Sequence, residues 1–214
     1  MKQINRVMLL LLLVSVISSA QTSPWAAGAH FIVSLPQSDF ANLSKDGEGI
    51  GGKLFYRPGM SRFFALRSDL NYISYGEKRN SMQASMGYFL VQVRNESFQL
   101  TVGPQLSLPI GRFTVYAAPM AVIYNYRTVA SVPELYYYYG YPAAETTTSL
   151  TRWGWNVNAG LLIDIGIGPH IDIGAKYQKI AKAVKTEIND IKVEKDATDI
   201  CICIGVTFFL KSKY

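Results

Sequence analysis

The chain has 214 residues, of which 49% are hydrophobic and 17% are charged, and its formal net charge is +6. This composition excludes intrinsic disorder, which requires low hydrophobicity and high net charge. Two cysteines exclude a disulfide scaffold and a four-thiolate zinc site. The basic residues are scattered, which argues against a nucleic-acid partner.

Residues 1–20 have the pattern of a secretory signal peptide. Lys2 and Arg6 precede an apolar core that runs from Val7 to Ile17, and Ser18-Ser19-Ala20 supplies the small residues of a cleavage site. A membrane anchor is the competing interpretation, but the apolar core is short and polar residues follow it directly. We therefore expect export of the chain, with residues 21–214 forming one mature domain.

Apolar and polar residues alternate with a period of two along most of the mature chain, which is the pattern of β-strands. The runs, of about 9–13 residues, are longer than soluble strands and match the ~9–11 residues of a tilted transmembrane strand. In such a strand the apolar face contacts lipid and the polar face lines the lumen. Run length, aromatic content and the export signal favour a membrane barrel over a soluble sandwich.

Nine runs show this alternation, whereas a bacterial barrel needs an even number of strands. The runs are 26–36, 49–57, 63–75, 83–94, 97–109, 112–129, 149–166, 169–182 and 198–210. The run at 83–94 has the weakest pattern, so we assign it to an extracellular excursion. We predict an all-β, up-and-down antiparallel transmembrane β-barrel of eight strands. Ten strands is the alternative, if 76–94 contains a second crossing.

The connections are of two kinds. Short segments with Pro and Gly lie at 57–60, 109–112 and 166–169, and longer polar stretches lie at 37–48, 76–82, 131–148 and 186–197. Short periplasmic turns and longer extracellular loops are typical of bacterial outer-membrane barrels.

Five segments of the chain carry a family resemblance, namely His30–Pro36, Asp39-Phe40, Gly49–Lys53, Gly103–Leu106 and Arg112–Tyr116. They resemble the OmpA/OmpX-type small outer-membrane β-barrels of diderm bacteria. The resemblance covers about residues 21–214 and implies a folded outer-membrane domain, without implying one activity. It also implies that the barrel assembly machinery reads a C-terminal signal of alternating apolar residues before a final aromatic residue. Val206, Phe208, Leu210 and Tyr214 fit that signal, and Ser212 departs from it.

Charged residues of both signs fall on the faces that we expect to line the lumen. They are Lys53, Arg67, Asp69, Arg152, Asp164, Asp172 and Lys176. An eight-stranded barrel is just wide enough for side chains to fill it. Because unpaired buried charges are costly, we expect these residues to form a salt-bridged polar network that plugs the lumen. A narrow polar pore is the alternative.

The expected loop at 131–148 is the candidate contact surface for an extracellular partner. It contains Tyr136, Tyr137, Tyr138, Tyr139 and Tyr141, and tyrosines bind partners at a low cost in side-chain entropy. An aromatic collar at the membrane surface is the alternative. We interpret Trp153, Trp155, Tyr124 and Tyr126 as anchors at that surface.

The sequence contains no common catalytic motif, and we predict neither an enzyme nor a cofactor or metal site. The family includes small barrels that modify lipids with a His, a Ser and an acidic residue near the rim, but neither His30 nor His170 has a neighbouring Ser and acid pattern. Cys201 and Cys203 share one strand face about 6.5–7 Å apart, at the limit for a disulfide, so we expect two free thiols.

The sequence therefore predicts a monomeric outer-membrane barrel with a structural or surface-interaction role. Its expected partners are outer-membrane lipid, the barrel assembly machinery and, through the loop at 131–148, a molecule outside the cell. A passive channel for small or hydrophobic solutes is one alternative. A soluble, exported binding barrel of the lipocalin type is another.

Overall fold

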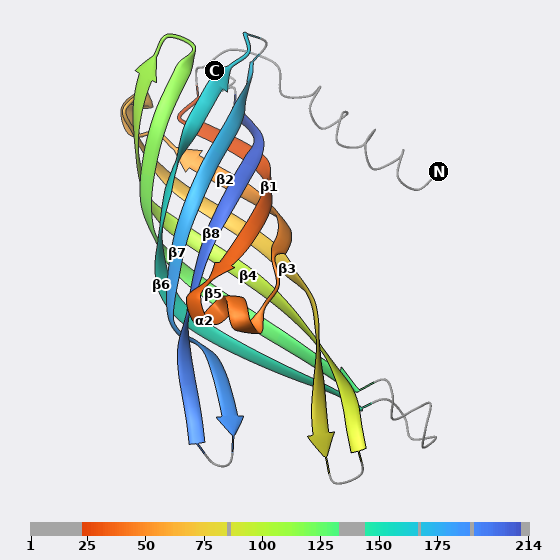
Figure 1. Ribbon diagram of the computed structural model, residues 1–214. Coiled ribbons are helices and arrows are strands. Elements are labelled where there is room, and N and C mark those ends of the chain that lie inside the picture. Colours follow the sequence, from red (N-terminus) through yellow and green to blue (C-terminus); the bar gives the residue numbers. More distant parts are fainter. Residues whose placement is uncertain (1–22, 85–86, 133–143, 167, 189–190, 211–214) are drawn as a thin grey trace, which may run out of the picture.

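The computed structural model describes residues 23–84, 87–132, 144–166, 168–188 and 191–210. Eight strands follow one another along the chain, each antiparallel to the next, and β8 pairs with β1 to close a barrel (Figure 1). The strands are β1 (Trp25–Gln37), β2 (Gly47–Tyr56), β3 (Phe64–Ala84), β4 (Gly87–Ile110), β5 (Phe113–Val132), β6 (Ala144–Asp164), β7 (Pro169–Ile188) and β8 (Ile191–Phe209). The predicted eight-stranded up-and-down barrel is thus confirmed.

The weak run at 83–94 is divided between two strands. Its first residues end β3, and residues 87–94 begin β4, so that the β3–β4 hairpin continues past the level at which we expected it to end. The pairing shifts register between Tyr75 and Lys78, which marks where the extension starts. No further crossing lies in the described part of this region, so the ten-strand alternative is wrong.

The two ends of the barrel differ. At one end, strands are joined by the 3-10 turn η1 (Pro58–Met60) and by tight turns in which Gly111 and Gly166 have positive φ. Ala26 of β1 pairs with Phe209 of β8 at this same rim. The end with short turns is the periplasmic end in bacterial barrels.

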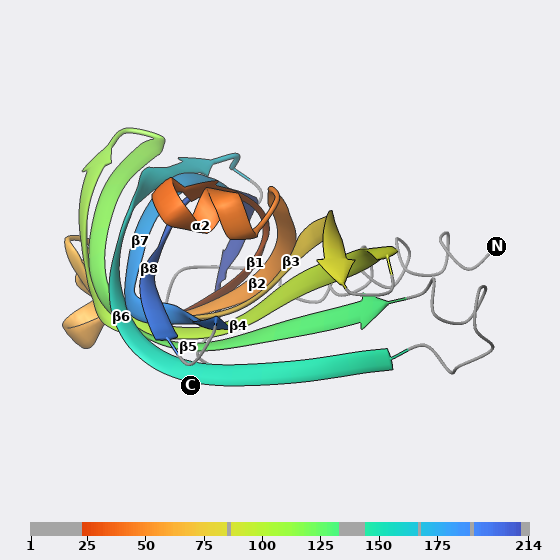
Figure 2. The ribbon, with the colours of Figure 1, turned by 60° about the horizontal axis from the view of Figure 1, so that its bottom comes forward.

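At the opposite end, paired strands extend beyond the barrel (Figures 1 and 2). Polar stretches that we expected to be loops, such as 76–82, are largely strand there. β6 pairs with β5 along its whole length but with β7 only from Gly154 to Asp164. Residues 144–153 of β6 therefore have a strand partner on one side only.

The side-chain distribution is inverted relative to a soluble protein. The outer wall carries large exposed apolar residues on every strand, among them Phe31, Ile50, Leu70, Val102, Val115, Trp155, Ile173 and Ile204. The lumen holds buried polar residues such as Gln99, Asn156 and Lys176. An apolar belt around a polar interior is the arrangement that lipid requires. The soluble lipocalin-like alternative is excluded, because such a barrel would place its apolar rows inside.

Candidate functional site

The centre of the lumen holds a bidentate ion pair. Arg67 Nε donates to Asp69 Oδ1 and Arg67 Nη2 donates to Asp69 Oδ2, each at 2.8 Å. A third donor of the same guanidinium, Nη1, bonds Gln105 Oε1 at 3.2 Å. Both charged side chains are almost fully buried. Bidentate pairing of this kind is the strongest geometry available to Arg and a carboxylate.

A second ion pair spans the lumen between distant strands. Lys53 of β2 donates to Asp172 of β7, and both side chains are buried. The Tyr116 hydroxyl donates to the other oxygen of Asp172 at 2.8 Å. The hydroxyl lies beside Gly160 and Gly174, where an added Cβ would approach it to 2.5 and 2.6 Å. These paired glycines make room for Tyr116.

Two further polar contacts lie in the lumen. Lys176 Nζ donates to Gln99 Oε1 at 2.9 Å, and His30 Nε2 lies 2.9 Å from Asn71 Oδ1. The structure thus brings together five of the seven residues that we predicted to line the lumen. They are Lys53, Arg67, Asp69, Asp172 and Lys176.

The other two predicted lumen residues lie apart from this network. Asp164 lies at the end of β6, near the short-turn rim, where Oδ1 accepts a bond from the Gly166 amide at 2.8 Å. Arg152 lies toward the opposite end, where its guanidinium bonds the Thr151 carbonyl at 3.3 Å. The alternation along β6 predicts which face of the strand a side chain lies on. It does not predict how far along the strand the buried polar network extends.

An aromatic plug, which the sequence analysis did not identify, closes the lumen toward the long hairpins. The short helix α2 (Ser38–Leu43) folds over the barrel mouth (Figure 2). Its Phe40 is fully buried and meets Tyr75 and Tyr126 edge-on, at ring distances of 5.3 and 5.8 Å. Tyr75 in turn donates to Asp199 Oδ2 at 2.8 Å. This hydrogen bond therefore connects the aromatic plug to the polar interior below it.

The placement of two tyrosines corrects our interpretation. Trp153 and Trp155 are exposed on the outer wall, but Tyr124 and Tyr126 are buried inside the barrel and stack at 5.7 Å. The inward face of β5 is largely apolar, and it contains Tyr116, Ala118, Met120, Val122, Tyr124 and Tyr126. Because both faces of this strand are apolar, alternation of polarity did not identify the inner one.

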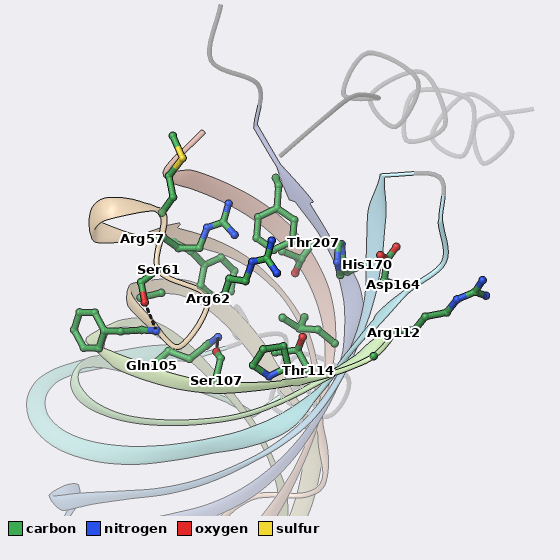
Figure 3. A pocket seen from close by; sticks show the side chains of 18 residues that line it. Arg57, Ser61, Arg62, Gln105, Ser107, Arg112, Thr114, Asp164, His170 and Thr207 are labelled. Atoms are coloured by element: carbon green, nitrogen blue, oxygen red, sulfur yellow. Dashed lines mark hydrogen bonds between the residues drawn. The ribbon is translucent and has the colours of Figure 1, made fainter. Parts of the chain in front are cut away.

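A blind cavity of about 350 Å³ opens at the short-turn rim (Figure 3). Arg57 and Arg62 point into it, whereas the guanidinium of Arg112 points away (Figure 3). Phe55 forms part of its inner wall and lies under the Arg67 guanidinium, 5.5 Å from the ring centre. Phe55 therefore lies between the cavity and the Arg67–Asp69 ion pair, and Gln105, which also lines the cavity, bonds Arg67.

Other predicted features lie on the outer wall or outside the described residues. Val206 is exposed on the outer wall, and Phe208 and Leu210 are half-buried. Tyr214 and the tyrosines at 136–141 lie outside the described residues. Cys201 and Cys203 are free thiols.

The described residues contain no group of three or more His, Cys, Asp or Glu side chains that could hold a metal ion. In the same part of the chain, no helix is both long and apolar enough to cross a membrane.

Solved structures of small outer-membrane proteins share this fold. The neisserial surface protein A, NspA, aligns with 88% of this chain and 98% of its own, at 15% identity and a TM-score of 0.55. OprG from Pseudomonas aeruginosa aligns with 89% of this chain and 98% of its own, at 11% identity and a TM-score of 0.50. No protein-family model and no curated protein sequence matches the chain.

Fold and surface together define the class of protein. A closed barrel of eight antiparallel strands, with an apolar outer wall and a polar lumen, is an outer-membrane β-barrel. Within that class, the chain has the architecture of the small barrels of the OmpA/OmpX type.

Proposed function

We propose that the protein is a closed outer-membrane barrel that serves a structural or surface-interaction role rather than catalysis or transport. The observation that carries this proposal is the filled lumen. Two ion pairs, Arg67–Asp69 and Lys53–Asp172, occupy its centre, and Phe40 covers the end toward the long hairpins. An eight-stranded barrel has room for side chains or for solute, but not for both.

The extended strands support a role outside the cell. Residues 144–153 of β6 have no pairing with β7, although residues 144–163 of β6 pair with β5. An unpaired edge presents main-chain donors and acceptors to which another strand can add. We retain the tyrosines of the predicted loop at 131–148 as candidate contact residues.

The remaining parts of the proposal follow from the class of protein. The protein would act as a monomer in outer-membrane lipid, after insertion by the barrel assembly machinery. Val206, Phe208, Leu210 and Tyr214 are the residues that we propose as its assembly signal. Cleavage of residues 1–20 would precede insertion.

A solute-efflux assay tests whether the lumen is closed. Proteoliposomes of the purified barrel should retain a small sugar and show no stepwise conductance in planar bilayers. A matched variant with Arg67, Asp69, Lys53 and Asp172 changed to Ser and with Phe40 changed to Ala should leak, which verifies that the assay detects an open lumen. Conductance of the unmodified barrel would instead favour the passive-channel alternative.

A complementation experiment separates the structural role from the surface role. Cells that lack the protein would receive either the full chain or a variant whose β5–β6 hairpin is shortened beyond Asn125 and Thr151. If the role is structural, both should restore detergent resistance of the envelope. If the role is surface interaction, only the full chain should restore adhesion or aggregation of the cells. Failure of the full chain in both assays would contradict the proposal.

A further inference from the structure

The cavity at the short-turn rim faces the periplasm and lies next to the filled lumen, to which Gln105 connects it through Arg67. It is a blind pocket of about 350 Å³, within the range of roughly 300–1,000 Å³ found for small-molecule sites. Phe55, Leu162 and Phe209 give it an apolar inner wall. Because it lies within the strand barrel, a ligand would reach it from the aqueous side.

Two cationic side chains share the mouth of this cavity. Arg57 and Arg62 both point into it (Figure 3). Burial lowers the pKa of the Arg57 guanidinium, and the neighbouring Arg62 lowers it further. Neither arginine forms a salt bridge with any residue that the structure describes. Two adjacent positive charges without a counter-charge favour the binding of an anion.

The position of Arg57 is fixed by its surroundings. Its guanidinium carbon lies 4.2 Å from the centre of the Phe209 ring, and Nη2 donates to the Ser23 carbonyl at 2.9 Å. Its Nε is buried and has no hydrogen-bond partner among the described residues. Arg57 is therefore held in place with one donor unused.

A buried hydroxyl adds a second unused polar group to the cavity wall. Thr207 is 1% exposed and lines the cavity from β8, and its Oγ1 has no hydrogen-bond partner among the described residues. On the far side of the cavity, Asp164 lies beside His170, and its carboxylate bonds the Gly166 amide (Figure 3). The negative charge therefore lies away from the two inward-pointing arginines.

We propose that this cavity binds a soluble organic anion from the periplasm. Its phosphate or carboxylate group would lie between Arg57 and Arg62, because guanidinium groups match the planar geometry of such oxygens. Its apolar body would lie against Phe55, Leu162 and Phe209. Thr207 would supply a hydrogen bond where the two parts of the ligand meet.

Nuclear magnetic resonance of the barrel in nanodiscs of zwitterionic lipid tests this site. The probe is 1-naphthyl phosphate, and 1-naphthol is its neutral match. We expect the phosphate to shift the amide signals of residues around the cavity in a saturable manner. The double variant Arg57→Gln, Arg62→Gln should weaken its Kd at least tenfold. Thr114→Trp, which fills the mouth of the cavity, should abolish binding.

The double variant Arg79→Gln, Arg127→Gln is the matched control, since it also removes two positive charges, but at the opposite end of the barrel. It should leave the Kd unchanged, and heat-modifiable migration in gels should show that every variant is folded. Equal affinity for 1-naphthol, or an unchanged Kd in the double variant, would overturn the proposal. Equal shifts with inorganic phosphate alone would also overturn it, because the apolar wall would then play no part.

The lipid composition of the nanodiscs distinguishes a soluble ligand from a lipid headgroup. In discs that contain phosphatidylglycerol, we expect the probe to bind with the same Kd at moderate salt concentration. If the cavity signals are already shifted in those discs and the probe no longer binds, a lipid headgroup occupies the arginines and a soluble ligand is the wrong assignment. None of these measurements depends on whether the lumen conducts.

Discussion

At the scale of single residues, the buried ion pairs are the most sensitive positions in the barrel. Replacing Arg67 with Met leaves the Asp69 carboxylate buried and unpaired, which costs about 3–5 kcal/mol. The double variant Arg67→Met, Asp69→Leu removes both charges and should recover much of that loss. Urea unfolding of the barrel in lipid vesicles measures the difference. A double variant less stable than Arg67→Met would show that the pair is not the cause.

Gly174 offers a second test at this scale, because its missing side chain leaves space for Tyr116. A methyl group there would lie 2.6 Å from the Tyr116 hydroxyl, so that Gly174→Ala must displace the donor to Asp172. Overpacking of this kind costs about 1–3 kcal/mol. Gly52→Ala is the matched control, since its nearest neighbour would be the Gly28 carbonyl at 3.9 Å. Equal unfolding free energies for the two variants would argue against this account.

At the scale of elements, we expect helix α2 to control whether water reaches the lumen from outside. Phe40 packs in the same cluster as Cys201, which is fully buried. In a Cys203→Ser background, Phe40→Ala should therefore raise the rate at which a small methanethiosulfonate reagent modifies Cys201, by at least tenfold. Phe40→Leu, which keeps most of the volume, should raise it far less. Equal rates in all three proteins would show that α2 is not the barrier.

The elements also show which parts of the structure the sequence could predict. The outward rows of β4, β7 and β8 followed from alternation, since lipid demands apolar side chains at every second position. Helix α2 did not, because it has six residues within a polar stretch and is held by tertiary contacts of Phe40. The tyrosines of β5 were misplaced because an aromatic plug makes the inner face as apolar as the outer one. The rim cavity was missed because Arg57, Arg62 and Thr207 come from separate elements.

At the scale of the whole molecule, the signal peptide and the barrel make a joint prediction. Mass spectrometry of the protein from the outer-membrane fraction should give a chain that begins at Gln21. The same sample should migrate differently in gels before and after boiling, because a closed barrel resists detergent until it is heated. An intact Met1 on a membrane-bound chain would support the anchor alternative instead.

The two ion pairs of the lumen differ in when they can form. Arg67 and Asp69 are two residues apart on β3, so their charges can be neutralised as soon as that strand is extended. Lys53 and Asp172 are 119 residues apart on β2 and β7, and β1 and β8 lie between those strands in the sheet. This second pair forms only once the first and last strands have met. It therefore opposes the separation of β1 from β8, because opening of that seam would leave Lys53 without its carboxylate inside a membrane and Asp172 with the Tyr116 hydroxyl alone.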